Sequence, residues 1–210
     1  MTQKPLIPNA IRCVVFDFHK TLCSEPYFLP LGLPFVDSVG ELVFGGNSEK
    51  WADPWMRGDL SSDDIAEYLS QHCTYKRTEI LNGLRQGCAN MHFNPGVWQF
   101  AQAQKRSGRK TVLATANMDV FTEVIVPSHS LQTVFDVIMN TADIGTLEKE
   151  VLWQQALHEL RDGASFSNSL LIDDSAPMVS LFAELGGAAY QYVGDDELRR
   201  WALLNGFAVT

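Results

Sequence analysis

The sequence predicts an α/β protein built on a doubly wound parallel sheet. Short apolar runs of strand length alternate with segments whose apolar residues recur at helical spacing. Several of these runs end in a polar residue, as strands do at the carboxyl edge of a parallel sheet. The chain has 210 residues, which is enough for one such core with an inserted subdomain. Strands that alternate with helices imply parallel pairing.

The first expected strand covers residues 11–18. Its run Val14-Val15-Phe16 ends in Asp17, and the chain then turns polar. A continuous apolar run fits a strand that is buried on both faces. Asp17 therefore lies at the sheet edge where open α/β folds bind their ligands.

The segment after this strand has a different composition. Residues 25–46 are rich in proline and glycine, which suits a lid or cap entrance better than a sheet core. A helix is expected to begin where Ser61 or Ser62 can cap it and acids fill its first turn. A second helix is predicted from Lys76 to about Asn90.

These features predict two units. Residues 24–93 form an α-helical cap inserted after the first strand, and residues 1–23 and 94–210 form the α/β core. The remaining core elements are predicted in chain order as a helix at 97–105, a strand at 111–114, a helix at 120–126 ended by Pro127, a strand at 134–139, a helix at 148–160, a strand at 169–172, a helix at 177–185, a strand at 188–193 and a helix at 196–204.

Composition excludes several classes of function. The net charge of −9 opposes binding to nucleic acid or to an anionic membrane surface, but it allows a small anionic substrate. No apolar stretch is long enough to span a bilayer, and the N-terminus lacks the apolar region of a signal peptide. We therefore expect a cytoplasmic protein. The four cysteines form no Cys-x-x-Cys pair, which favours reduced thiols.

Polar residues at three strand ends are expected to meet in one crevice. They are Asp17, Thr115 and the pair Asp173-Asp174. Lys149 begins a helix after Ile144-Gly145-Thr146. Acids that hold a cation beside a lysine that holds phosphoryl oxygens make a reasonable phosphate site.

These segments resemble the four ordered motifs of the haloacid dehalogenase (HAD) superfamily. The motifs are separated by 98 residues from Asp17 to Thr115, 34 more to Lys149 and 24 more to Asp173. The usual first motif is Asp-x-Asp-x-Thr, and His19 stands in place of the second acid. The matching segments are Asp17-Phe18-His19-Lys20-Thr21-Leu22, Leu113-Ala114-Thr115-Ala116-Asn117, Asp143-Ile144-Gly145-Thr146-Leu147-Glu148-Lys149 and Leu170-Leu171-Ile172-Asp173-Asp174-Ser175.

The resemblance implies a Rossmann-like core and a hydrolase that acts on a small phosphorylated substrate. Asp17 would be the nucleophile that forms an aspartyl-phosphate. Thr115 would donate a hydrogen bond to the transferring phosphoryl group, and Lys149 would neutralise carboxylate and phosphate charge. His19 would replace the usual acid/base, since imidazole can both give and take a proton.

The same resemblance implies a magnesium cofactor. Its ligands would be Asp17, Asp173, Asp174 and the backbone carbonyl of His19, and that carbonyl is independent of the side chain at position 19. Mg²⁺ keeps several water ligands, so a sparse protein shell suffices.

His19 leaves other functions open. A substrate with a good leaving group, such as an acyl phosphate, would hardly need an acid. Haloacid dehalogenation is a second alternative, and the retained Asp173-Asp174 pair argues against it. Phosphonate hydrolysis would need a cap lysine, for which Lys50 and Lys76 are available. A catalytically weak or inactive binding protein with the same fold is the competing class.

We expect residues of the cap and of the turn after Thr115 to select the substrate. Arg57 could clamp an anionic tail of the substrate, or it could be a solvated surface residue. Asn117 could touch the substrate or shape the turn. Trp51 and Trp55 could face the crevice or form the core of the cap.

Overall fold

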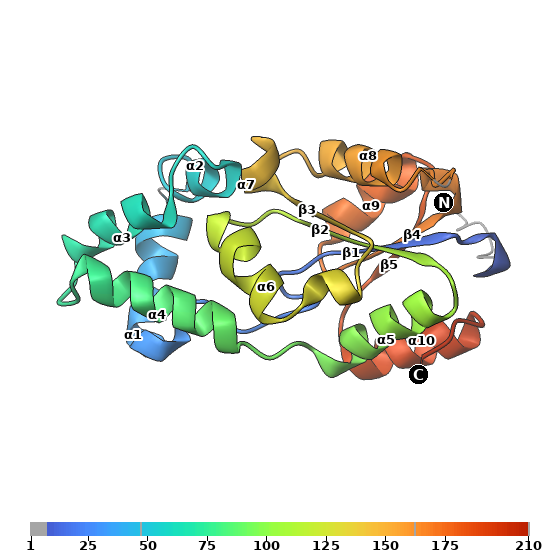
Figure 1. Cartoon of the computed structure of the whole chain (residues 1–210), viewed down its shortest axis with the longest axis horizontal. Coiled ribbons are helices and arrows are strands. Elements are labelled where there is room, and N and C mark those ends of the chain that lie inside the picture. The colour runs from blue at the N-terminus through green and yellow to red at the C-terminus, as the bar shows by residue number, and fades with distance from the viewer. Residues whose placement is uncertain (1–7, 47, 162, 210) are drawn as a thin grey trace.

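Within the part of the chain that the structure describes, five parallel strands form a sheet in the order β3-β2-β1-β4-β5, which confirms the predicted fold class. The computed structural model describes residues 8–46, 48–161 and 163–209. The strands, drawn across the middle of Figure 1, are β1 (Cys13–Phe16), β2 (Lys110–Thr115), β3 (Val137–Asn140), β4 (Ser169–Asp173) and β5 (Ala188–Gln191).

The central strand β1 is buried along its whole length because it pairs with β2 on one side and β4 on the other. Successive side chains of a strand point to opposite faces. Val14 and Phe16 therefore pack into one apolar cluster, whereas Cys13 and Val15 pack into a second cluster. This two-sided burial explains why the segment reads as a continuous apolar run.

Two pairs of helices cover the sheet. The helices α5 (Pro95–Arg106) and α10 (Asp195–Leu204) lie together on one face, and α8 (Lys149–Glu159) and α9 (Ala176–Glu184) lie on the other (Figure 1). Aromatic contacts link the layers, with ring centroids 6.1 Å apart for Phe16 and Phe100 of α5. Trp153 of α8 meets Phe182 of α9 edge to face at 5.1 Å.

The chain between β1 and α5 forms helices that lie at the carboxyl end of the strands (Figure 1). The residue boundaries of a separate cap, 24 and 93, stay a prediction. The helices of this insert are η2 (Leu29–Leu31), α1 (Leu33–Val39), η3 (Gly40–Phe44), α2 (Ala52–Arg57), α3 (Ser62–Ser70) and α4 (Arg77–Asn90).

Ser61, rather than Ser62, caps α3. The Ser61 hydroxyl accepts a hydrogen bond from the Asp64 backbone N–H at 3.2 Å, and the Asp64 carboxylate accepts one from the Ser61 N–H at 2.9 Å. This reciprocal pair is a capping box, which satisfies two backbone donors at the start of the helix. Ser62 is instead buried against Trp55 and Asp119.

Two predicted element boundaries differ from the structure. Pro127 does not end the helical segment: η4 (Phe121–Ile125) continues into α6 (Val126–Ser128), whose first turn contains this proline. A proline is tolerated there because its missing N–H is not needed by that turn. The expected strand 134–139 begins only at Val137, because its register with β2 starts there. Val134 and Phe135 are buried after the turn η5 (Leu131–Thr133), and this explains the earlier apolar signal.

Cys13, Cys23, Cys73 and Cys88 are free thiols. Among the helices in the described ranges, none combines the length and the apolar character that crossing a bilayer requires.

Gly87 gives a test of how the insert packs. A Cβ on Gly87 of α4 would overlap the backbone carbonyl oxygen of Tyr27, whereas a Cβ on Gly40 would meet no atom within 4 Å. We expect Gly87→Ala to lower the free energy of unfolding by about 1–3 kcal/mol through overpacking. The matched variant Gly40→Ala should be neutral or stabilising by up to about 1 kcal/mol, because Gly40 has helical angles.

Denaturant unfolding of both variants measures this difference. Equal midpoints for Gly87→Ala and the wild-type protein would show that α4 and the segment around Tyr27 can separate without loss of stability.

Candidate functional site

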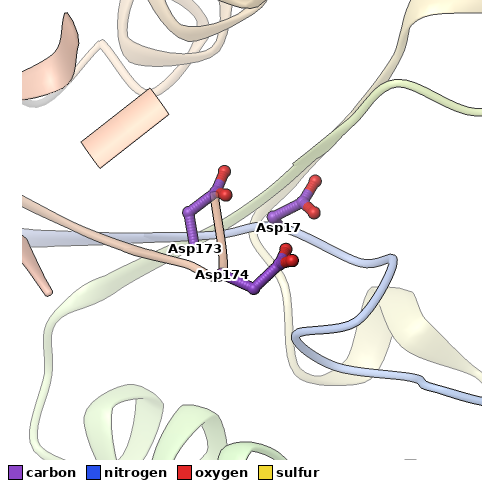
Figure 2. Close-up of side chains that lie close together, drawn as sticks. All are labelled: Asp17, Asp173 and Asp174. Carbon is purple, nitrogen blue, oxygen red and sulfur yellow. The ribbon is translucent and has the colours of Figure 1, made fainter. Parts of the chain in front are cut away.

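Three carboxylates gather at the carboxyl edge of the sheet. Asp17 follows β1, Asp173 ends β4 and Asp174 comes next in the chain. Each offers an oxygen within 4.8 Å of the others, and Figure 2 shows the three side chains close together. The register that pairs Phe16 with Ile172 brings these strand ends to the same level.

Lys149 joins the carboxylates. Its Nζ contacts the Asp17 carboxylate, lies 3.9 Å from Asp173 Oδ2 and donates a hydrogen bond to the Ala114 carbonyl at 3.1 Å. Lys149 is the first residue of α8, where a cation is disfavoured by the partial positive charge of a helix N-terminus. The two carboxylates offset this cost, so tertiary contacts determine its position.

Asp173 is almost completely buried, with 1% of its surface exposed. Its Oδ1 accepts a hydrogen bond from the Ser175 N–H at 2.8 Å, but its buried Oδ2 has no hydrogen-bond partner within the described ranges. Burial, followed by the negative charge of Asp17, raises the pKa of Asp173 well above its ordinary value. A bound cation would offset both effects. The oxygen-only donor set and the orphaned Oδ2 therefore fit a hard divalent ion such as Mg²⁺.

Two threonines complete this sheet edge. Thr115 ends β2 and is fully buried, and its hydroxyl has no hydrogen-bond partner within the described part of the chain. Thr21 was not predicted as a site residue, although it lies in the first motif. Its hydroxyl oxygen accepts a hydrogen bond from the Asp174 N–H at 3.0 Å. Thr21 thereby fixes the loop after β1 against the loop after β4.

Comparisons with known proteins support the fold. No protein-family model and no curated protein sequence matches the chain. Solved structures do match. A HAD family enzyme from Bacteroides thetaiotaomicron, in complex with magnesium and inorganic phosphate, is 14% identical with a TM-score of 0.61. The match covers 88% of this chain and 95% of that enzyme.

Two further structures extend this finding. An L-2-haloacid dehalogenase from Xanthobacter autotrophicus, with chloropropionic acid covalently bound, is 13% identical, with a TM-score of 0.62. That match covers 94% of this chain and 84% of the dehalogenase. A predicted HAD-like family hydrolase from Porphyromonas gingivalis is 16% identical, with a TM-score of 0.60. That match covers 87% of this chain and 91% of the predicted hydrolase. The chain has the fold of the HAD family. The resemblance found in the four motifs is thus confirmed for the fold.

His19 lies in the tight loop of this HAD fold that follows Asp17. The Cys23 N–H donates a hydrogen bond to the Phe18 carbonyl at 2.9 Å, and Lys20 has a left-handed φ of 59°. His19 is exposed to solvent, while its ring centroid lies 6.2 Å from that of Tyr27. Atoms packed around the ring remove part of its hydration, which lowers the pKa of His19 despite the nearby Asp17 charge.

Asn117 is buried and shapes the turn after β2. Its Oδ1 accepts a hydrogen bond from the Met118 N–H at 2.9 Å, and its Nδ2 donates one to the Tyr27 hydroxyl at 2.8 Å. Its backbone N–H donates to Thr141 Oγ1 at 3.0 Å. Contact between Asn117 and a substrate stays a prediction.

Arg57 ends α2 and is 39% exposed. Its Nε donates a hydrogen bond to the Asp59 carboxylate at 2.6 Å. This contact ties Arg57 to a neighbouring surface acid, and its role in substrate binding stays a prediction. Lys50 and Lys76 are both exposed, and Lys50 lies 4.9 Å from the ring of Trp51.

Trp55 belongs to the core of the insert. It is fully buried, and its indole N–H donates hydrogen bonds to Asp119 at 3.0 Å and to Ser62 at 3.2 Å. Asp119 also accepts a hydrogen bond from the Ser62 N–H at 2.8 Å. No local signal marks Tyr27 or Asp119, because their partners are far away in the sequence.

Magnesium is expected to stabilise the protein against heat. An ion that binds only the folded state at one hundred times its Kd adds about 2.7 kcal/mol to the free energy of unfolding. We expect the thermal midpoint to rise with millimolar Mg²⁺, and Asp174→Asn to remove most of that rise. Asp143→Asn is the matched control: Asp143 is an exposed acid that accepts a hydrogen bond from Thr122 and lies outside the cluster.

Differential scanning fluorimetry with and without EDTA measures these shifts. An equal rise in wild type and Asp174→Asn would place Mg²⁺ elsewhere on the protein.

Proposed function

We propose that the protein is a Mg²⁺-dependent phosphatase that hydrolyses a small phosphorylated metabolite through an aspartyl-phosphate intermediate. The contact of Lys149 with Asp17, beside Asp173 and Asp174, is the main support. A HAD family enzyme with the same fold was solved with magnesium and phosphate. The predicted cytoplasmic location is compatible with such a substrate.

Asp17 is the proposed nucleophile. One carboxylate oxygen forms a bond to phosphorus while the bond from phosphorus to the leaving oxygen breaks, which gives an acyl phosphate. Lys149 holds Asp17 and balances negative charge at the same point. The hydroxyl of Thr115 has no hydrogen-bond partner among the described residues and is available to donate a hydrogen bond to a phosphoryl oxygen.

Mg²⁺ would be held by Asp17, Asp173, Asp174 and the backbone carbonyl of His19. When bound, it supplies positive charge that offsets the carboxylates and polarises the phosphoryl group.

His19 is the proposed acid/base. Its protonated ring would give a proton to the leaving oxygen. The neutral ring would then take a proton from the water that attacks the aspartyl-phosphate, which releases inorganic phosphate and restores Asp17. Its position in the loop directly after Asp17 supports this role.

A panel of small phosphate esters, with and without Mg²⁺, tests the reaction. We expect phosphate release from at least one ester in wild type, and we expect Asp17→Asn to reduce it to background because the nucleophile is lost. Asp143→Asn should retain wild-type turnover. Phosphate release by Asp17→Asn at the wild-type rate would rule out the aspartyl-phosphate route.

Haloacid dehalogenation is the second candidate, because a dehalogenase from Xanthobacter autotrophicus shares the fold. It would need no metal. Halide release from 2-chloropropionate in the presence of EDTA, together with no phosphate release from any ester, would favour dehalogenation over phosphatase activity. The buried Oδ2 of Asp173, which accepts no hydrogen bond from the described residues, favours the metal-dependent reaction.

Substitution at position 19 tests the proton transfer. His19→Asn keeps a polar side chain of similar reach but cannot exchange a proton, so kcat should fall about 10²–10⁴-fold. His19→Asp restores a titratable group and should recover much of the rate. Steady-state kinetics on the best ester of the panel measures both variants. Wild-type kcat in His19→Asn would mean that the leaving group departs without an acid.

A further inference from the structure

Tyr27 is a polar side chain of the insert that lies beside His19 and Asn117. It lies between β1 and η2, and its hydroxyl oxygen accepts the hydrogen bond from Asn117 Nδ2 at 2.8 Å. A phenol can accept and donate at the same time. Because Asn117 donates in this pair, the hydroxyl hydrogen of Tyr27 is available for another acceptor.

Three residues locate Tyr27 beside the proposed reacting groups. Its ring centroid is 6.2 Å from that of His19, and Asn117 lies two residues beyond Thr115. Burial raises the pKa of Tyr27 far above its ordinary range, and the negative charge of Asp17 adds to this shift. The hydroxyl therefore stays protonated and keeps its donor hydrogen.

The hydroxyl is held in place from two sides. The backbone carbonyl of Tyr27 packs so closely on α4 that only the missing Cβ of Gly87 leaves room for it. On the other side, Asn117 is fixed by hydrogen bonds with the Met118 N–H and Thr141 Oγ1. A donor fixed in advance loses little conformational freedom when a ligand binds.

We propose that Tyr27 is a specificity-determining residue whose hydroxyl donates a hydrogen bond to an oxygen of the organic part of the substrate. This inference rests on the proposed phosphatase function. Lys149 and Thr115 face the phosphoryl group in that function, whereas His19 faces the leaving oxygen. Tyr27 is the neighbour of His19, so the acceptor belongs to the leaving group. Phosphate esters that carry a hydroxyl or carboxylate on a short organic part are the substrate class that fits.

Paired substrates separate this contact from a structural role. Glycerol 1-phosphate and phosphoglycolate carry an acceptor oxygen, whereas propyl phosphate has a similar size and lacks one. Tyr27→Phe removes only the hydroxyl. For the better oxygen-bearing ester, KM should rise about tenfold with kcat unchanged, which is the range for one neutral hydrogen bond lost from uniform binding. The KM for propyl phosphate and the inhibition constant of inorganic phosphate should stay constant.

Tyr75→Phe is the matched control. The Tyr75 hydroxyl donates to the Leu31 carbonyl at 3.1 Å inside the insert, so all kinetic constants should be those of wild type. An unchanged KM in Tyr27→Phe for both oxygen-bearing esters overturns the proposal. An equal rise for propyl phosphate also overturns it, because the hydroxyl would then act only by supporting Asn117.

Failure of the phosphatase function gives a different result. In that case the wild-type protein releases no phosphate from any of the three esters and does not bind inorganic phosphate. If Tyr27→Phe does not fold, a fluorotyrosine placed at position 27 of the wild-type chain gives the readout. Its ¹⁹F resonance should shift with 3-hydroxypropylphosphonate and Mg²⁺ more than with propylphosphonate and Mg²⁺, and equal shifts overturn the proposal.

Discussion

The attraction between Lys149 and the acids at the sheet edge is the interaction on which the site depends. Two unit charges about 4 Å apart interact by about 4 kcal/mol where the effective dielectric constant is near 20. Asp17, Asp173 and Asp174 lie close enough to repel one another, and Lys149 supplies one positive charge against three carboxylates. The remaining negative charge, partly out of water, makes this edge receptive to a divalent cation.

The sheet makes this arrangement possible. β1 lies between β2 and β4, so Asp17 follows a strand that neighbours both Thr115 and Asp173. The apolar faces of β1 are buried on both sides, which leaves the strand end as the place where its polar side chains can lie. The burial of the strand and the position of the polar side chains at its end are thus two results of the same topology.

The insert is attached to the core through the loops that carry the site. Asn117 donates to Tyr27, and two residues later Asp119 accepts from Trp55 and Ser62. The turn after Thr115 therefore depends on the insert for its conformation. Any movement of the insert against the sheet would break these hydrogen bonds and would change the turn after Thr115.

The sequence by itself determined the fold class, most of the core elements and the acids of the site. Continuous apolar runs ending in Asp17 and Asp173 carry that information locally, since two-sided burial requires apolar side chains and the strand end allows polar ones. The start of β3 was predicted too early, because the buried residues Val134 and Phe135 before the strand resemble strand residues in the sequence. The helical segment was predicted to end at Pro127, but a proline is tolerated in the first turn of α6.

Only the tertiary structure decided how the side chains pair. Thr21 meets Asp174 across 153 residues, and Tyr27 meets Asn117 across 90. No local pattern encodes such pairs, because the sequence around a tyrosine does not show whether its hydroxyl has a distant hydrogen-bond partner. The same limit applies to Arg57 and Trp55. The sequence shows the charge of Arg57 and the size of Trp55, but only the fold shows that Arg57 contacts Asp59 and that Trp55 is buried.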